Sequence, residues 1–243
     1  MSTHPTRRDE SAQEWGGPRH SRRVALPVGL YKHAVAVFLG ALVLFIIGTP
    51  FAQTLPDPGL LEGVLLTGVL VCGVLAVGGR RQALVLTALL GVPALGSKWL
   101  NHFWPDLFPS GISLLLGVLL LAVVTLQLLR FILRAPRVDS EVLSAGVATY
   151  LVLALMWTLL YLLAQSLIPN AFVVAESASA NKTFDSFNAI YFSFITLCTV
   201  GYGDIVPAAP VVRMLAVLEA VTGVLYLSVL IARLVTLYSD KQE

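Results

Sequence analysis

The chain has 243 residues, of which 57% are hydrophobic and 12% are charged, with a formal net charge of +2. Because soluble domains carry about 25% charged residues, this composition excludes a disordered chain, a nucleic-acid-binding protein with a basic face and an ordinary soluble enzyme. Both cysteines, Cys72 and Cys198, lie in apolar segments, so no disulfide framework is expected. The composition is typical of a protein that crosses a membrane several times.

Residues 1–33 are polar, rich in Arg, Ser, Gly and Pro, and lack apolar periodicity. We expect a disordered basic tail whose arginines flank the first membrane helix on its cytoplasmic side.

Six apolar segments follow, and each is expected to form a membrane helix, which needs about 20 apolar residues. The third is the weakest, because it is short and contains Gly91, Pro93 and Gly96. A further apolar stretch, Phe187–Val200, suits a re-entrant helix better than a span because it has only 14 residues. The six predicted spans are Ala34–Ala52, Gly59–Gly78, Ala83–Lys98, Ser110–Leu133, Leu143–Ile168 and Pro210–Tyr238.

The basic residues predict the orientation of these spans, because cytoplasmic loops carry an excess of Lys and Arg. With the amino terminus inside, only Lys98, Lys182 and Arg213 of the 16 lysines and arginines fall on the outer side. We therefore expect a multi-pass protein of the cell membrane with both termini in the cytoplasm.

The segment that follows the re-entrant stretch is Thr199-Val200-Gly201-Tyr202-Gly203. Non-helical backbone at membrane depth is tolerated only where it is buried in protein or lines a water-filled path. Alternating glycines permit dihedral angles that other residues avoid, so successive carbonyl oxygens can turn to one side. Such a row of oxygens can replace the hydration shell of a monovalent cation. One chain cannot surround an ion in this way, so the pattern implies a symmetric oligomer.

The same five residues are identical to the selectivity-filter motif of potassium channels, and the unit from Leu143 to Tyr238 resembles a potassium-channel pore domain. The resemblance implies an all-α membrane protein with six transmembrane helices and a re-entrant pore helix and filter loop between the fifth and the sixth. Residues 34–138 would be a four-helix domain in the position of a voltage sensor, and residues 139–243 the pore domain. It also implies a homotetramer that lies in membrane lipid and binds potassium ions. It does not imply a nucleic-acid partner or a small-molecule substrate.

The resemblance also gives roles to individual residues of the motif. Potassium ions would be bound mainly by backbone carbonyls, helped by the Thr199 hydroxyl, while the Tyr202 ring would point away from the axis and brace the filter against the pore helix. The residues assigned to the filter are Thr199, Val200, Gly201, Tyr202 and Gly203, of which the first four would hold the ions.

Asp204 would lie at the outer mouth of the filter and pair with an aromatic donor on the pore helix, which by register is Tyr191. Plain packing or an interfacial position is the alternative for Tyr191. Some bacterial relatives carry a glutamate behind the filter where this chain has Ile195, so strong filter inactivation of that type is not expected.

Two residues of the last helix are gating candidates. Gly223 falls where many members of the family have a hinge glycine, and either bending or close packing would explain it. Glu219, one turn earlier, is a carboxylate inside a span, which is a functional-site hypothesis by default. It faces either the back of the pore helix or the central cavity, and the sequence leaves both orientations open.

The first four spans lack the regularly spaced arginines of a voltage sensor, which needs several charges because each contributes only about 2.3 kcal/mol per 100 mV. Arg130, Arg134 and Arg137 cluster at the inner end of the fourth span, where anchoring explains them. Glu62 lies near an outer helix end and offers no partner at mid-depth. Passive potassium conduction with weak or absent voltage gating is the predicted function.

The chain shows no metal-ligand spacing, nucleophile motif or phosphate loop, so it is not expected to be an enzyme. Two other functions remain as alternatives. A non-conducting membrane subunit or scaffold that keeps the pore fold is one alternative. A poorly selective cation channel is the other, although such channels usually replace the filter tyrosine, which is intact here as Tyr202.

Overall fold

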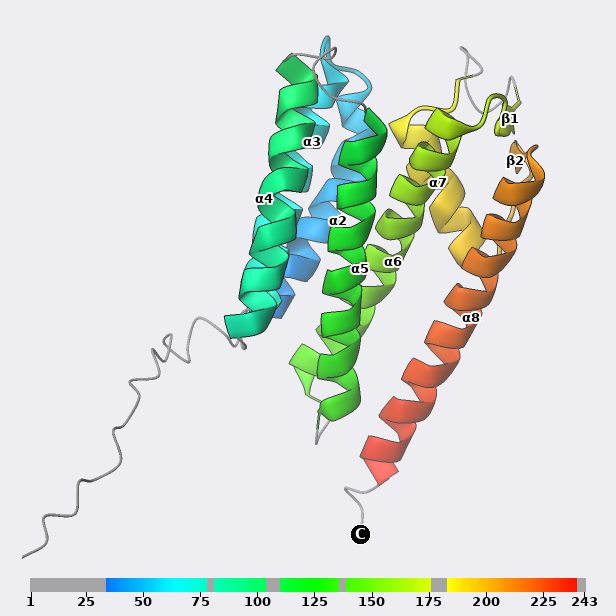
Figure 1. Cartoon of the computed structure of the whole chain (residues 1–243). Helices are drawn as coiled ribbons and strands as arrows, with labels where there is room; N and C mark the ends of the chain where they lie inside the picture. Colours follow the sequence, from blue (N-terminus) through cyan, green and yellow to red (C-terminus); the bar gives the residue numbers. More distant parts are fainter. Residues whose placement is uncertain (1–33, 78–80, 104–109, 136–138, 176–182, 240–243) are drawn as a thin grey trace, which may run out of the picture.

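The computed structural model describes residues 34–77, 81–103, 110–135, 139–175 and 183–239, so the predicted tail at residues 1–33 and Arg137 lie outside the described residues. In these ranges the chain forms seven helices and one small sheet (Figure 1). The helices are α2 (Ala34–Ala52), α3 (Pro58–Val77), α4 (Arg81–Phe103), α5 (Ser110–Arg134), α6 (Ser140–Leu167), α7 (Ser186–Leu197) and α8 (Pro210–Ser239).

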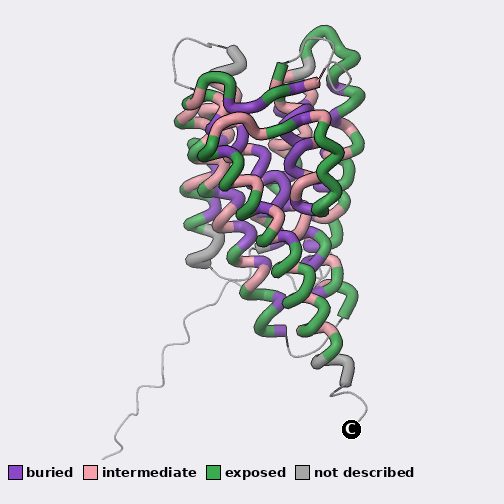
Figure 2. The backbone as a smooth tube through the Cα atoms, turned by 90° about the vertical axis from the view of Figure 1, so that its right-hand side faces the viewer, coloured by how far each residue is buried: buried purple, intermediate pink, exposed green. Residues whose placement is uncertain are grey.

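Helices α2 to α5 form a bundle that packs against α6, mainly through α5 and α2. Phe38 and Leu42 of α2, Leu120 and Leu128 of α5, and Val152 of α6 are buried in its core. The helices expose much of their outer faces (Figure 2). These faces are also apolar, with many exposed leucines and valines. Helices that are hydrophobic on every face are buried in a large core or in a membrane. The long apolar stretches of this sequence therefore form long helices.

Five helices are long and apolar enough to cross a membrane: α2, α3, α5, α6 and α8. The third predicted span is helical as α4, but its apolar part, Val85–Leu100, is shorter than a typical span. Pro93 lies inside this helix without ending it. Five candidate spans are therefore established by length and composition, against the six that the sequence predicts.

A second core lies between α6, α7 and the start of α8, and it is aromatic. The Tyr161 ring contacts Phe172 and Phe192 edge to face, with ring centroids 5.6 Å and 5.0 Å apart. Phe172 belongs to β1 (Phe172–Val174), which pairs antiparallel with β2 (Ile205–Pro207). The sequence did not predict this two-stranded sheet, which is short and lies in loops on either side of α7.

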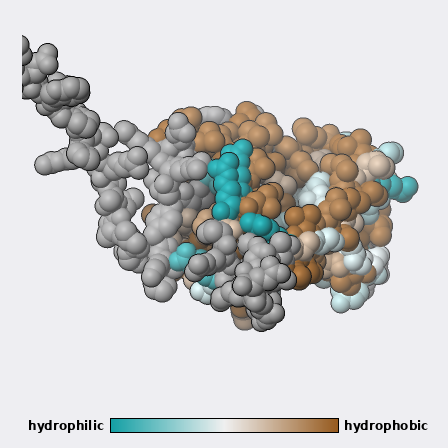
Figure 3. All heavy atoms as spheres, turned by 90° about the horizontal axis from the view of Figure 1, so that it is seen from below, coloured by the Kyte–Doolittle hydropathy of each residue, from teal (hydrophilic) through white to brown (hydrophobic). Residues whose placement is uncertain are grey.

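Helix α8 is covered on one side only. In α8, 11% of the residues in its apolar stretch are buried, against 56% in α6. Seen from below, most of the described surface is hydrophobic (Figure 3). Apolar surface on this scale marks contact with lipid or with another protein.

Candidate functional site

Helix α7 positions the candidate site. Its 12 residues extend about 18 Å, too short to cross a hydrocarbon core of about 30 Å. The Asp185 carboxylate caps its first turn by accepting a hydrogen bond from the Asn188 amide at 2.8 Å. The Asn188 side chain in turn donates to the Thr183 carbonyl at 2.7 Å. Helix α7 packs against both α6 and α8, so it is held between two long helices (Figure 1).

The backbone after α7 alternates in conformation. Thr199, Gly201 and Gly203 have positive φ angles of 57°, 54° and 81°, whereas Val200 and Tyr202 between them do not. This alternation turns successive peptide groups so that their carbonyl oxygens share one side of the chain. Glycine adopts a positive φ without strain, but a β-branched residue rarely does, and such strain gathers at functional sites. The glycines indicated this backbone conformation in the sequence, whereas nothing in the sequence indicated the positive φ of Thr199.

Hydrogen bonds to the last turn of α7 hold this segment in place. The Thr199 amide donates to the Thr196 carbonyl at 2.9 Å, and the Val200 and Gly201 amides donate to the Ile195 carbonyl at 2.8 Å and 3.3 Å. These amides satisfy carbonyls that a helix end leaves open. Within the described residues, no donor reaches the five carbonyls from Thr199 to Gly203. The segment therefore presents a row of unpaired oxygens.

The side chains of the same segment are exposed in the single chain, including Val200 and Tyr202. The Tyr202 ring nevertheless has one neighbour, because it lies parallel to the Tyr191 ring of α7 with centroids 6.4 Å apart and an interplanar angle of 4°. This contact lies on the α7 side of the segment.

Asp204 joins α7 to the small sheet. Its carboxylate accepts a hydrogen bond from the Tyr191 hydroxyl at 2.8 Å, which is the pairing expected from the sequence. Its backbone carbonyl accepts the Ala175 amide at 2.8 Å, next to the paired residues Val174 and Ile205. The sheet thus fixes the chain where it leaves the Thr199–Gly203 segment, and the functional role of the Tyr191–Asp204 pair stays a prediction.

The other end of the segment is fixed by the Leu197 carbonyl at the end of α7. It accepts a hydrogen bond from the Tyr150 hydroxyl of α6 at 3.2 Å. Helix α8 also approaches so closely that a Cβ atom at position 223 would lie 2.3 Å from this oxygen. Gly223 therefore permits close packing of α8 on α7, one of the two explanations left open by the sequence, and its role as a hinge stays a prediction.

Glu219 is fully buried behind α7. Its carboxylate accepts hydrogen bonds from the Tyr161 hydroxyl of α6 at 2.6 Å and from the Ser193 hydroxyl of α7 at 2.5 Å. Ser193 also lies 2.7 Å from the Ala154 carbonyl of α6. Of the two orientations considered, the carboxylate takes the one toward the pore-helix side, and any role in gating stays a prediction. Sequence reasoning missed Tyr161 and Ser193, whose only signal was a polar group inside an apolar run.

Among the described residues of helices α2 to α5, basic side chains do not form a regularly spaced row along one helix. Arg130 and Arg134 are exposed at the end of α5. Glu62 is buried at the opposite end of the bundle, near the start of α3, where it faces Lys98 of α4.

Comparisons with known proteins agree with this geometry. Residues 148–240 match the model of a family described as ion channel. The chain is 37% identical over 95 residues to two-pore potassium channel 4 of Arabidopsis thaliana. The aligned part covers 39% of this chain and 33% of the relative. It is 36% identical over 67 residues to two pore potassium channel c of Oryza sativa subsp. japonica, which covers 28% of this chain and 15% of the relative.

It is also 36% identical over 62 residues to a voltage-gated potassium channel of Aeropyrum pernix, which covers 25% of this chain and 21% of the relative. The matched parts span a third or less of each of these relatives. No solved structure matches the chain.

Proposed function

From the premise that residues 148–240 are an ion-channel pore domain, distantly homologous to potassium channels, we propose that the protein conducts potassium selectively and passively across the membrane. The observation that carries this proposal is the row of unpaired carbonyls from Thr199 to Gly203 on a backbone of alternating φ. Rings of backbone carbonyls replace the hydration shell of potassium in selectivity filters.

The roles of the residues follow from this geometry. The carbonyls of Thr199, Val200, Gly201 and Tyr202, with the Thr199 hydroxyl, hold the permeant ions, and Gly203 completes the filter. The ions are cargo that moves between adjacent sites by mutual repulsion. The Tyr191 contacts to Tyr202 and Asp204 brace the filter from the side of α7.

The filter requires several copies of the chain, and we propose a homotetramer. One chain supplies one row of oxygens, and only rows arranged around an axis can enclose an ion. The apolar face of α8, with Val217, Val221 and Val224 exposed, supplies surface for neighbouring subunits and for the lining of the conduction path.

Each subunit crosses the membrane six times in this proposal, with both termini in the cytoplasm of a cell-membrane protein. The 23 residues of α4 extend about 34 Å, which exceeds the hydrocarbon thickness of about 30 Å although the apolar part is shorter. Residues 1–33 form a basic tail, residues 34–138 the four-helix domain and residues 139–243 the pore domain.

Voltage dependence is weak or absent, since the exposed Arg130 and Arg134 lie together at one end of α5. Gating, where present, acts through the contacts that α8 makes with α7 at Gly223 and Glu219.

The test is the reversal potential of the purified protein in liposomes, with potassium on one side and sodium on the other. A value near the potassium equilibrium potential is expected, and a value near zero with current would identify a poorly selective cation channel instead. The absence of current under all conditions would favour a non-conducting subunit.

Gly201→Ala is the informative variant. An added Cβ atom would meet nothing within 4 Å, so its effect comes from the strain that alanine has at a φ of 54°. Strain of about 1–2 kcal/mol should displace the carbonyls and abolish selectivity. Gly40→Ala is the matched control, because nothing lies within 4 Å of a Cβ there. Unchanged potassium preference in Gly201→Ala would overturn the filter assignment.

A further inference from the structure

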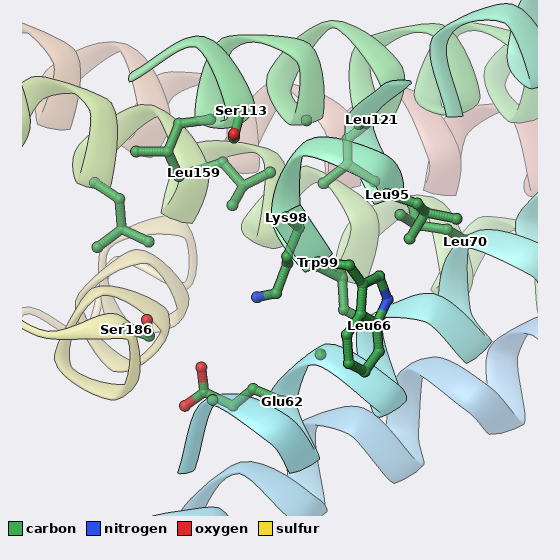
Figure 4. Close-up of a pocket in the computed structure, with 16 residues that line it drawn as sticks. Glu62, Leu66, Leu70, Leu95, Lys98, Trp99, Ser113, Leu121, Leu159 and Ser186 are labelled. Atoms are coloured by element: carbon green, nitrogen blue, oxygen red, sulfur yellow. The ribbon is translucent and has the colours of Figure 1, made fainter. Parts of the chain in front are cut away.

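A cavity of about 440 Å³ lies between the four-helix part and the start of α7. It is lined by residues of α3, α4, α5 and α6, and by Ser186, the first residue of α7 (Figure 4). Its volume falls within the range of about 300–1,000 Å³ that small-molecule sites occupy. The residues proposed for conduction do not line it.

Two opposite charges meet in this cavity. The Glu62 carboxylate of α3 and the Lys98 ammonium of α4 both point into it, with Ser186 beside the carboxylate (Figure 4). Glu62 is only 8% exposed; Gln53 Nε2 donates to its carboxylate at 3.4 Å, and the Ser186 side chain also interacts with it. Among the residues that the structure describes, Glu62 and Lys98 interact across the cavity without forming a direct ion pair.

Charges removed from water are costly unless each has a close opposite partner. A simple cation would satisfy Glu62 but would be repelled by Lys98. A simple anion would satisfy Lys98 but would be repelled by Glu62 and by Asp185, whose charge also acts on Glu62. A molecule that carries both an ammonium and an anionic group satisfies both side chains.

Apart from Ser113, the rest of the lining is mainly apolar and includes Leu66, Leu95, Leu121 and Leu159. The charged groups lie near helix ends, since Glu62 is in the second turn of α3 and Lys98 is near the end of α4. The cavity thus has a charged end and an apolar wall, and the outer surface of the chain is hydrophobic. This arrangement matches a phospholipid whose head group lies at the charged end of the cavity.

We propose that this cavity binds the head group of a zwitterionic phospholipid that carries a primary ammonium. The ammonium donates hydrogen bonds to Glu62, the phosphate accepts from Lys98, and the first part of an acyl chain lies against the leucines. Because Ser186 begins α7, the bound lipid contacts the helix that positions the Thr199–Gly203 segment. The inference does not rest on potassium conduction, since its test reads lipid binding alone.

The test is lipid titration of the full-length purified protein by native mass spectrometry. The probes are phosphatidylethanolamine, phosphatidylcholine, whose quaternary ammonium has no N–H to donate, and soluble phosphoethanolamine. Wild type should bind phosphatidylethanolamine more tightly than phosphatidylcholine. Lys98→Gln should weaken phosphatidylethanolamine binding roughly 10- to 100-fold, the range for loss of a charge-assisted hydrogen bond. Glu62→Gln should remove the preference for phosphatidylethanolamine over phosphatidylcholine.

Arg130→Gln is the matched control, because it removes one exposed positive charge at the opposite end of the bundle and should leave binding unchanged. The double variant Glu62→Lys with Lys98→Glu keeps both charges in the cavity and should restore binding if a single variant folds poorly. Equal affinity for the two lipids in wild type, or unchanged affinity in Lys98→Gln, would overturn the proposal. Phosphoethanolamine binding as tight as that of the lipid would assign the cavity to a free zwitterion and overturn the lipid.

Discussion

Glu219 in the pore unit and Glu62 in the four-helix part are both buried carboxylates, and their surroundings differ. Hydroxyls from two other helices, Tyr161 of α6 and Ser193 of α7, contact Glu219 at 2.6 Å and 2.5 Å. Glu62 has a long contact from Gln53 at 3.4 Å and faces a cavity that also holds Lys98. Short hydrogen bonds from the fold satisfy the first carboxylate, whereas the second has weaker contacts and faces an opposite charge across a cavity.

The difference extends to how each region is held together. Described polar contacts join α6, α7 and α8 at several levels, through Tyr150, Glu219 and Tyr226, whose hydroxyl donates to the Gly146 carbonyl at 2.6 Å. The four-helix part packs mainly through apolar side chains such as Phe38 and Leu120. Hydrogen bonds fix position more narrowly than apolar contacts do, so the region that must hold carbonyls in register uses them.

The largest expected effect comes from Glu219→Leu. The substitution leaves the buried Tyr161 hydroxyl without its acceptor, at a cost of about 1–3 kcal/mol. It also removes the Ser193 contact to the carboxylate, although Ser193 keeps the Ala154 carbonyl as an acceptor. We expect a lower free energy of unfolding in a detergent-denaturation assay and loss of potassium selectivity in liposomes.

Glu219→Gln is the control for this variant, because its amide oxygen still accepts a hydrogen bond in nearly the same volume. It should keep most of the stability. If Leu and Gln at position 219 prove equally harmless, the carboxylate does not join the three helices, and the contrast with Glu62 fails.

A smaller effect is expected from Gly223→Ala. The new methyl group would lie 2.3 Å from the Leu197 carbonyl oxygen, so α8 must move away from α7. Overpacking of this kind costs about 1–3 kcal/mol. The shift should appear as a lower apparent Tm and altered open probability in single-channel recordings. Gly68→Ala, where a Cβ meets nothing within 4 Å, should be neutral. An unchanged Tm would contradict close packing, and an altered open probability at unchanged Tm would favour the hinge explanation.

Tyr150→Phe should have a smaller effect again, since it removes one hydrogen bond of 3.2 Å to the Leu197 carbonyl and keeps the ring that stacks on Tyr226. A net loss of about 1 kcal/mol is expected from detergent denaturation. Selectivity should be retained, because the Val200 and Gly201 amides still hold the segment to Ile195. Loss of selectivity in this variant would show that a single contact, rather than the whole set, positions the carbonyls.

Local sequence signals predicted much of the pore unit. Chain length and apolarity predicted the long helices, and the resemblance to potassium channels, applied by register, paired Tyr191 with Asp204, which are in contact at 2.8 Å. What escaped prediction depends on how distant helices meet. No local pattern relates Ser193 to Glu219, 26 residues away, or to Tyr161. For Gly223, the choice between helix bending and close packing depends on whether another helix lies beside it, which the sequence does not show. The cavity between Glu62 and Lys98 likewise depends on how α3, α4 and α7 pack.

The smallest expected effect is that of neutralising Arg130 and Arg134 together. Both side chains are exposed at the end of α5, and substitutions at such sites change stability by less than about 0.5 kcal/mol. Charge that does not cross the membrane field contributes no gating energy, so the conductance–voltage curve of Arg130→Gln with Arg134→Gln should overlay that of wild type. Recordings in a planar bilayer over a wide voltage range test this. A large shift of the curve would make the four-helix part a voltage sensor, and the division between a precisely bonded pore unit and an apolar surrounding bundle would no longer describe the protein.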